Sequence, residues 1–318
     1  MTRSSRLRAA VSLFIFGVLG AIALLVLTRP RPLDGGSLPA HTPDLAHGEV
    51  LFHAGSCGSC HEAAQDAPGA DEGLPTGSAA FPTPVGTFYP GNLTPDPETG
   101  IGRWSEVEFV NAVTRGISPD GTHYLPAFPY PSLRLMPLED VLDLHAYLMS
   151  LPAVRSPHRE PDVPMTALAR RGVGIWKRLA LGVRRFEADP TRSDSWNRGA
   201  YLTNGPGHCG ECHTPRDWLM IADEARHLDG GPHPGGDGSV PSLRRLVERG
   251  RYKDVADLTL ALRFGETFGY DKLSSGSMAE IQMNLAQLPE SDVRAIAEYL
   301  LSLESEVRSE TQPSEGTR

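Results

Sequence analysis

Two copies of one short motif constrain the fold of this chain more than any other feature. The segments Cys57-Gly-Ser-Cys60-His61 and Cys209-Gly-Glu-Cys212-His213 both read Cys-x-x-Cys-His and together contain all 4 cysteines. Each motif places two thiols about one helical turn apart, with an imidazole directly after them. This arrangement predicts two thioether bonds to one porphyrin and an iron ligand on the same side. We therefore expect two covalent haem c groups, with His61 and His213 as axial ligands.

Two other uses of the cysteines compete with haem attachment. Four cysteines in an exported protein would ordinarily predict two disulfides, and a zinc ion could take ligands from both motifs. Haem attachment is favoured because each motif lies in its own repeat, whereas one shared zinc site would pull the two repeats together.

The repeat has a period of about 150 residues, from Cys57 to Cys209. It predicts three pairs of helices. The first pair ends at the haem motifs, the second ends near Gly116 and Gly265, and the third carries apolar residues at helical spacing. The segments that match are 47–52 with 198–202, 102–107 with 250–255, and 139–148 with 291–300. One helical plan therefore occurs twice.

Composition divides the chain into six segments. They are a membrane anchor (1–31), a linker (32–43), a first haem domain (44–155), a connector with a basic helix (156–194), a second haem domain (195–305) and a disordered tail (306–318). The basic helix, at 166–186, has six Arg or Lys residues and no acid. It could contact anionic lipid or an acidic partner, but packing between acidic domains is the preferred interpretation. Residues 62–100 form a long insertion, either a cover over one haem edge or a surface excursion.

Residues 9–28 contain no charge and are as long as the roughly 20 residues of a membrane-spanning helix. The stretch lacks an Ala-x-Ala cleavage site, so an uncleaved anchor is favoured over a signal peptide. The flanking arginines favour a cytoplasmic N-terminus. The expectation is a single-pass protein of the inner (cytoplasmic) membrane with its haem domains in the periplasm. The net charge of −9 argues against nucleic acid as a partner.

A thioether sulfur is the expected sixth ligand of each iron. In the second repeat Met278 precedes the last helix and is preferred over Met283. The first repeat has no Met at the equivalent position, and Met136, just before its last helix, is preferred over an open or different sixth ligand. The remaining alternatives are two histidines that could replace it, His123 and His145, and two methionines that fit less well, Met149 within a helix and Met165 outside the repeat.

At this point a family resemblance becomes specific. The chain resembles bacterial diheme c-type cytochromes with class I cytochrome c domains, and is similar to the cytochrome c subunits of alcohol and gluconate dehydrogenases. The matching stretches are 48–52, 92–104, 124–136, 198–202, 207–216 and 278–280. The resemblance covers residues 40–305 and implies an all-α fold, two tandem domains each wrapped around one haem with His/Met ligation. Two departures are the absence of a third domain and Phe128, where some relatives carry Met.

Three functions follow as hypotheses. The leading one is a membrane-tethered electron relay with no independent catalysis, between a periplasmic or membrane dehydrogenase and an oxidase or quinol-linked complex. The alternative is a diheme enzyme, peroxidase-like, with an open coordination site at the first haem. A thiosulfate-oxidising version is disfavoured because no spare cysteine is left. The third is an anchoring subunit of a larger dehydrogenase.

Overall fold

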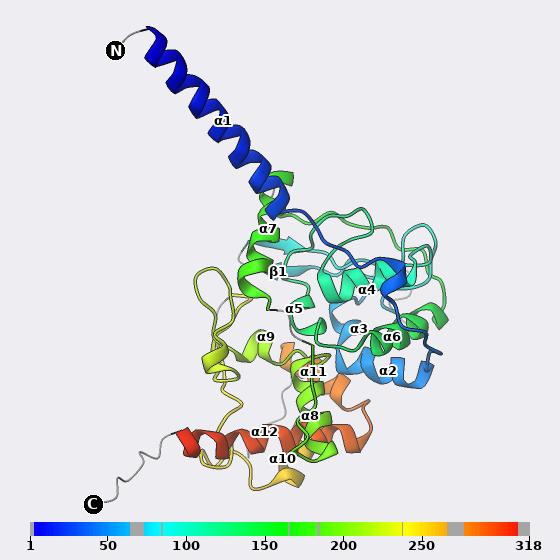
Figure 1. Ribbon diagram of the computed structural model, residues 1–318. Helices are drawn as coiled ribbons and strands as arrows, with labels where there is room; N and C mark the ends of the chain where they lie inside the picture. The colour runs from blue at the N-terminus through cyan, green and yellow to red at the C-terminus, as the bar shows by residue number, and fades with distance from the viewer. Residues whose placement is uncertain are drawn as a thin grey trace, which may run out of the picture.

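The computed structural model describes residues 3–63, 73–83, 85–164, 166–182, 185–236, 238–265 and 277–310. Helices are the main regular structure in this part of the chain, and the figures label them in chain order (Figure 1). Two short antiparallel strand pairs, β1 (Phe81–Thr83) with β2 (Gly86–Phe88) and β3 (Gly231–Pro232) with β4 (Ser239–Val240), add a minor β component to the predicted all-α fold.

The N-terminal helix α1 (Arg3–Leu27) projects away from the rest of the molecule (Figure 1). Within the described residues, no helix combines the length and apolar character that crossing a membrane requires. This finding contradicts the predicted transmembrane helix, and with it the single-pass location in the inner membrane and the membrane as a partner.

The six helices predicted from the repeat are confirmed. They are α2 (Leu45–Ala54), α4 (Glu106–Arg115) and α6 (Leu138–Ser150) in the first repeat, and α8 (Asp194–Asn204), α10 (Val255–Phe264) and α12 (Glu290–Glu310) in the second. The basic helix of the connector is α7 (Ala167–Ala180), shorter than predicted. The predicted disordered tail begins within α12, and residues 311–318 lie outside the described part of the chain.

Local chemistry explains where the middle helix of each repeat begins and ends. Ser105 and Glu108 form a capping box at the start of α4, and the side chain of Asp254 accepts the N–H of Asp257 at the start of α10. Both helices end on a glycine in the left-handed conformation, Gly116 (φ 58°) and Gly265 (φ 69°). The two repeats therefore encode this helix with the same start and stop signals.

In each repeat the first and last helices cross at a glycine. A Cβ on Gly48 of α2 would overlap the carbonyl oxygen of Asp143 in α6, and a Cβ on Gly199 of α8 would overlap that of Ala295 in α12. The absence of a side chain therefore lets the two backbones touch. Around both crossings the two repeats share one continuous core, which includes Leu51, Val141, Leu202 and Val293.

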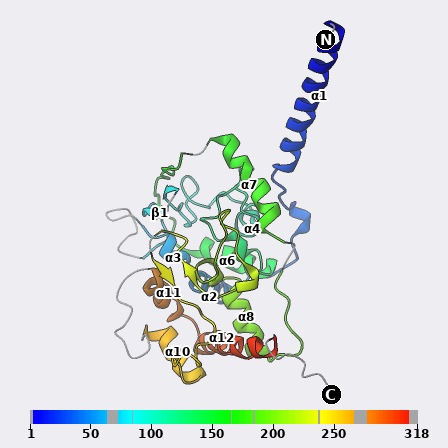
Figure 2. The same cartoon turned by 90° about the vertical axis from the view of Figure 1, so that its left-hand side faces the viewer.

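The helix α11 (Ser277–Leu285) belongs to the second repeat by sequence but packs against both repeats. It contacts α10, and it also contacts α2 of the first repeat (Figure 2). At this junction Asn284 Nδ2 donates to Ser59 Oγ at 2.7 Å. The helix thus links the region of Met278 to α3 (Cys57–Cys60), which carries the first motif.

Candidate haem sites

The backbone takes the same shape at both motifs. Ser56, directly before Cys57, has φ 46°, and His208, directly before Cys209, has φ 37°. This left-handed residue turns the chain out of the preceding helix and into a single helical turn. In both turns the N–H of the motif histidine donates to the carbonyl of the first cysteine at 2.9 Å. The Cys and His side chains are therefore presented in the same order in both repeats.

Each motif histidine is oriented by a backbone carbonyl. The Nδ1 atom of His61 lies 2.7 Å from Gly91 O, and that of His213 lies 2.7 Å from Pro241 O. A carbonyl can only accept, so Nδ1 carries the proton and Nε2 is left as the metal-binding atom. Burial lowers the pKa of both histidines, which favours the neutral imidazole that iron requires.

The loops that supply these carbonyls are held in place by a second equivalent contact. The N–H of Gly77 donates to His61 O at 2.9 Å, and the N–H of Gly230 donates to His213 O at 2.7 Å. Both glycines have positive φ, 75° and 73°. Part of the insertion at 62–100 therefore supports His61, and residues 64–72 and 84 of it lie outside the described residues. These supports could not be predicted from the sequence, because backbone atoms carry no residue-type signal.

None of the four cysteines forms a disulfide with another. Burial raises the pKa of Cys57 and Cys209 to about 12, so these thiols are protonated at neutral pH. Each site thus combines two thiols with a neutral imidazole whose Nε2 is the atom left to bind a metal. That donor set fits a c-type haem: the thiols would hold its vinyl groups and the imidazole its iron. The haem would supply the one-electron redox chemistry.

The two motifs lie against each other. His208 Nε2 is 3.2 Å from Gly55 O, so the turn before Cys209 touches the turn before Cys57. Desolvation raises the pKa of Cys60, followed by the charge of Glu280 and then by Cys212 of the other motif. From the first repeat, Ser132 Oγ also donates to Glu211 Oε1, inside the second motif, at 2.6 Å. The repeat predicted two separate sites, and no local pattern indicated their contact.

The two predicted thioether ligands have different surroundings. Met136 is 1% exposed and lines a cavity of about 370 Å³ whose described lining does not include Cys57, Cys60 or His61. Met278 is half-buried near the start of α11. Its competitor Met283, on the same helix, is 63% exposed.

The other sequence candidates for the first iron are placed elsewhere. His123 Nε2 lies 3.0 Å from Thr28 O, and its Nδ1 lies 3.1 Å from Lys177 Nζ, so both ring nitrogens are engaged. His145 is buried against Phe109, and its Nε2 has no hydrogen-bond partner among the described residues. Met149 is 36% exposed, and Met165 lies outside the described residues.

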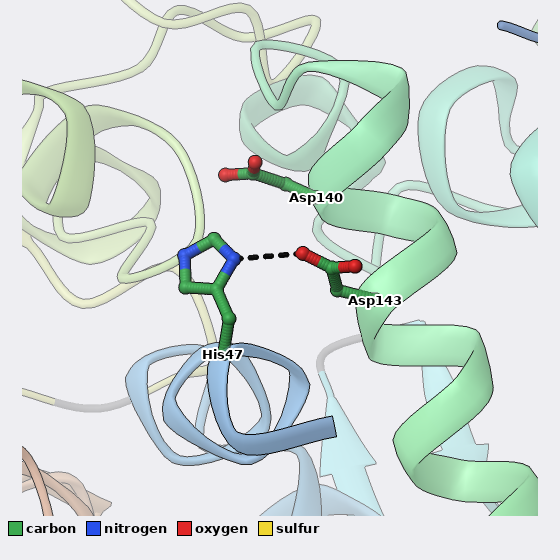
Figure 3. A group of neighbouring side chains, drawn as sticks. All are labelled: His47, Asp140 and Asp143. Atoms are coloured by element: carbon green, nitrogen blue, oxygen red, sulfur yellow. Dashed lines mark hydrogen bonds and ion pairs between the residues drawn. The ribbon is translucent and has the colours of Figure 1, made fainter. Parts of the chain in front are cut away.

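A polar cluster fixes the first helix crossing (Figure 3). His47 of α2 lies beside Asp140 and Asp143 of α6, with Nδ1 of His47 2.9 Å from Asp143 Oδ2. His41 Nε2 and the N–H of Asp44 also contact Asp143. In the second repeat the equivalent crossing is joined by a bidentate ion pair between Arg198 and Asp292, at 3.0 and 2.8 Å.

Comparison with known proteins gives strong matches over most of the chain. A diheme cytochrome c-type protein of Cereibacter sphaeroides is 39% identical over 284 residues, which cover 89% of this chain and 94% of that protein. A subunit of the nicotinate dehydrogenase of Pseudomonas putida is 39% identical over 91% of this chain. The fructose dehydrogenase cytochrome subunit of Gluconobacter japonicus is 33% identical over 88% of it. No family model matches the chain.

The extent of these matches differs between relatives. This chain spans 57% of the fructose dehydrogenase cytochrome subunit and 24% of the nicotinate dehydrogenase chain. The resemblance expected from the motifs is confirmed, and haem c is the cofactor it supports. With near full-length coverage on both sides of the Cereibacter alignment, the chain belongs to the diheme cytochrome c-type family.

Proposed function

We propose that this chain binds two haem c groups and passes electrons from one to the other. The observation that carries the proposal is the contact between the two attachment turns, His208 Nε2 with Gly55 O. Because each haem would be bonded to a cysteine within a few residues of this contact, the two porphyrins would lie close together. A relay needs such proximity and exposed haem edges, and it needs no substrate pocket.

The proposed ligands are His61 and Met136 for the first iron and His213 and Met278 for the second. The first haem domain is residues 44–155 and the second is 195–305. The orientation of both histidines by backbone carbonyls supports the proximal pair. Helix α11 carries Met278 near its start and reaches Ser59 of the first motif through Asn284 near its end, and this position close to the motifs supports Met278.

The proposed electron donor is a dehydrogenase, and the proposed acceptor is an oxidase or a quinol-linked complex of a respiratory chain. Several relatives are named as cytochrome subunits of fructose, alcohol and gluconate dehydrogenases. Contacts of this kind are commonly small and transient, so partner surfaces need not be large.

Haem counting and single-turnover kinetics test the relay. The wild-type holoprotein should contain two haems, and the paired variants Cys57→Ala/Cys60→Ala and Cys209→Ala/Cys212→Ala should each retain one. Rapid reduction of the wild type should show a second phase, independent of reductant concentration, that both variants lack. One haem in the wild type, or two haems reduced independently, would contradict the proposal.

A second candidate function is peroxide chemistry at the first haem. The observation that favours it is the position of Met136 in the wall of a cavity whose described lining omits the first motif. If no thioether reaches the first iron, that iron has an open coordination position. A high-spin ferric haem that reacts with hydrogen peroxide, lost with the first motif, would support this function. Two low-spin haems that do not react with peroxide would exclude it.

A further inference from the structure

A cationic cavity lies where the linker, the end of α4, the approach to α6 and α7 meet. Its volume is about 370 Å³. The charged side chains that line it are all basic and come from four separate parts of the chain: Arg29, Arg31, Arg115, Arg134, Lys177, Arg178 and Arg185. No aspartate or glutamate occurs among the described residues of the lining.

Three arginines of this cavity have no acidic partner among the described residues. Arg115, Arg178 and Arg185 form no ion pair with any residue in the described part of the chain, although acids outnumber bases in the sequence as a whole. Burial, and then the charge of Arg185, lower the pKa of Arg115. Arg115 is half-buried and Arg185 is exposed, and an anion between them would offset their mutual repulsion.

Internal hydrogen bonds hold the basic walls in place. Lys177 Nζ donates to Arg115 O at 2.6 Å and to Gly116 O at 2.7 Å, so α7 is fixed against the end of α4. Arg115 and Arg178 each donate one N–H to a backbone carbonyl, of Arg31 and Leu27 respectively. A guanidinium has five N–H donors, so each keeps donors for an oxyanion while its position is fixed.

The floor of the cavity is apolar. It is formed by Leu33, Ile117, Leu138 and Leu181, and Met136, the proposed ligand of the first iron, lies in the same lining. The volume falls in the range of small-molecule sites, which commonly combine an apolar lining with a few directed polar groups. A bare metal ion is excluded by the positive charge, and a neutral molecule would leave Arg115, Arg178 and Arg185 without an anionic partner among the described residues.

We propose that this cavity binds a small molecule through a phosphate group, which the arginines clamp while the rest of the molecule rests on the apolar floor. Arginine forks match the geometry of phosphate oxygens, and the charge of a phosphate offsets the repulsion between Arg115 and Arg185. The phosphate could belong to a free phosphate compound or to a lipid headgroup, since the chemistry of recognition is the same.

Calorimetric titration of the full-length holoprotein with inorganic phosphate and pyrophosphate tests the site. The wild type should bind pyrophosphate more tightly than phosphate, and Arg115→Gln/Arg185→Gln should weaken binding at least tenfold. The matched control is Arg249→Gln/Arg294→Gln, which removes the same charge from residues outside the cavity lining. The variant Arg115→Lys/Arg185→Lys keeps the charge but loses the guanidinium fork. Its affinity for pyrophosphate should therefore lie between those of the wild type and of Arg115→Gln/Arg185→Gln.

Haem absorbance and circular dichroism of each variant show whether it has folded. Vesicles of phosphatidylglycerol, with phosphatidylcholine vesicles as reference, separate the two sources of phosphate. Cavity-dependent binding to phosphatidylglycerol alone assigns the site to a lipid headgroup, and binding of pyrophosphate assigns it to a free compound. Neither probe binding to the wild type, or equal loss in the Arg249/Arg294 control, would overturn the proposal.

Discussion

His208 and Gly55 join the two candidate haem sites: the imidazole Nε2 of His208 lies 3.2 Å from the carbonyl oxygen of Gly55. Each residue stands within two positions of the first cysteine of its motif. The repeats are therefore in contact at the point where the cofactors would be attached.

Replacing His208 should affect communication between the sites more than either site alone. We expect His208→Ala to keep both haems, to lower the free energy of unfolding by about 0.5–1.5 kcal/mol through the lost hydrogen bond, and to slow electron exchange between haems. Haem content, urea unfolding and flash-induced electron transfer measure these three quantities. The control is His158→Ala, at an exposed side chain, which should change none of them.

Substituting alanine for a glycine should lower stability at a helix crossing and raise it at an exposed helix position. Gly48→Ala should destabilise the protein by about 1–3 kcal/mol, because its methyl group would overlap Asp143 O. Gly172→Ala in α7 meets open space and should stabilise the helix by up to about 1 kcal/mol. Thermal unfolding of the two variants beside the wild type checks both signs, and equal effects would contradict the close crossing.

Asp143 should make the first crossing sensitive to acid. Burial alone would raise the pKa of its carboxyl group, but the N–H of Asp44 and the imidazoles of His41 and His47 together hold it below 3.8. An Asp with a lowered pKa stabilises the fold above its unfolded pKa, and this contribution is lost as the pH falls through the folded value. Asp143→Asn should therefore cost about 1–3 kcal/mol at pH 7, and the difference from wild type should shrink below about pH 4. Urea unfolding between pH 3 and pH 7 measures it.

Lys177 should make the stability of the protein depend on pH above about pH 7. Burial lowers the pKa of its amine from 10.5 to about 7. Between these two values the unfolded chain binds a proton that the folded chain does not, so stability should rise with pH from about 7 towards 10.5. Lys177→Met should flatten this rise. The free energy of unfolding is measured at pH 7, 8 and 9 for the wild type, for Lys177→Met and for the control Lys253→Met, whose lysine is exposed. The control should show the same rise in stability with pH as the wild type. The same rise in Lys177→Met would show that Lys177 stays charged in the folded protein.

The thioether ligands can be tested by substitutions that conserve volume. Met136→Leu and Met278→Leu should each abolish the sulfur-to-iron charge-transfer band of one haem and lower its reduction potential, because a thioether favours reduced iron. Met283→Leu, at a 63% exposed side chain, should leave both spectra unchanged. A wild-type spectrum at the first haem in Met136→Leu would show that this iron has another ligand.

Local patterns in the sequence predicted the helices of both repeats, since spacing and capping residues such as Ser105 and Asp254 act over a few positions. They also identified the cysteines and histidines of the motifs. They could not identify Gly91 and Pro241, which act through backbone carbonyls, or pair His208 with Gly55 across about 150 residues. The membrane anchor predicted from the uncharged stretch at 9–28 is contradicted, because no helix in the described part of the chain is long and apolar enough to cross a membrane.

The hydrogen bond from Asn284 to Ser59 makes the two repeats depend on each other. Helix α11 belongs to the second repeat by sequence but lies against the cysteine turn of the first. Separating the two repeats would break this contact and would also divide the continuous core that they share. Although one helical plan occurs twice, neither copy is a self-contained folding unit.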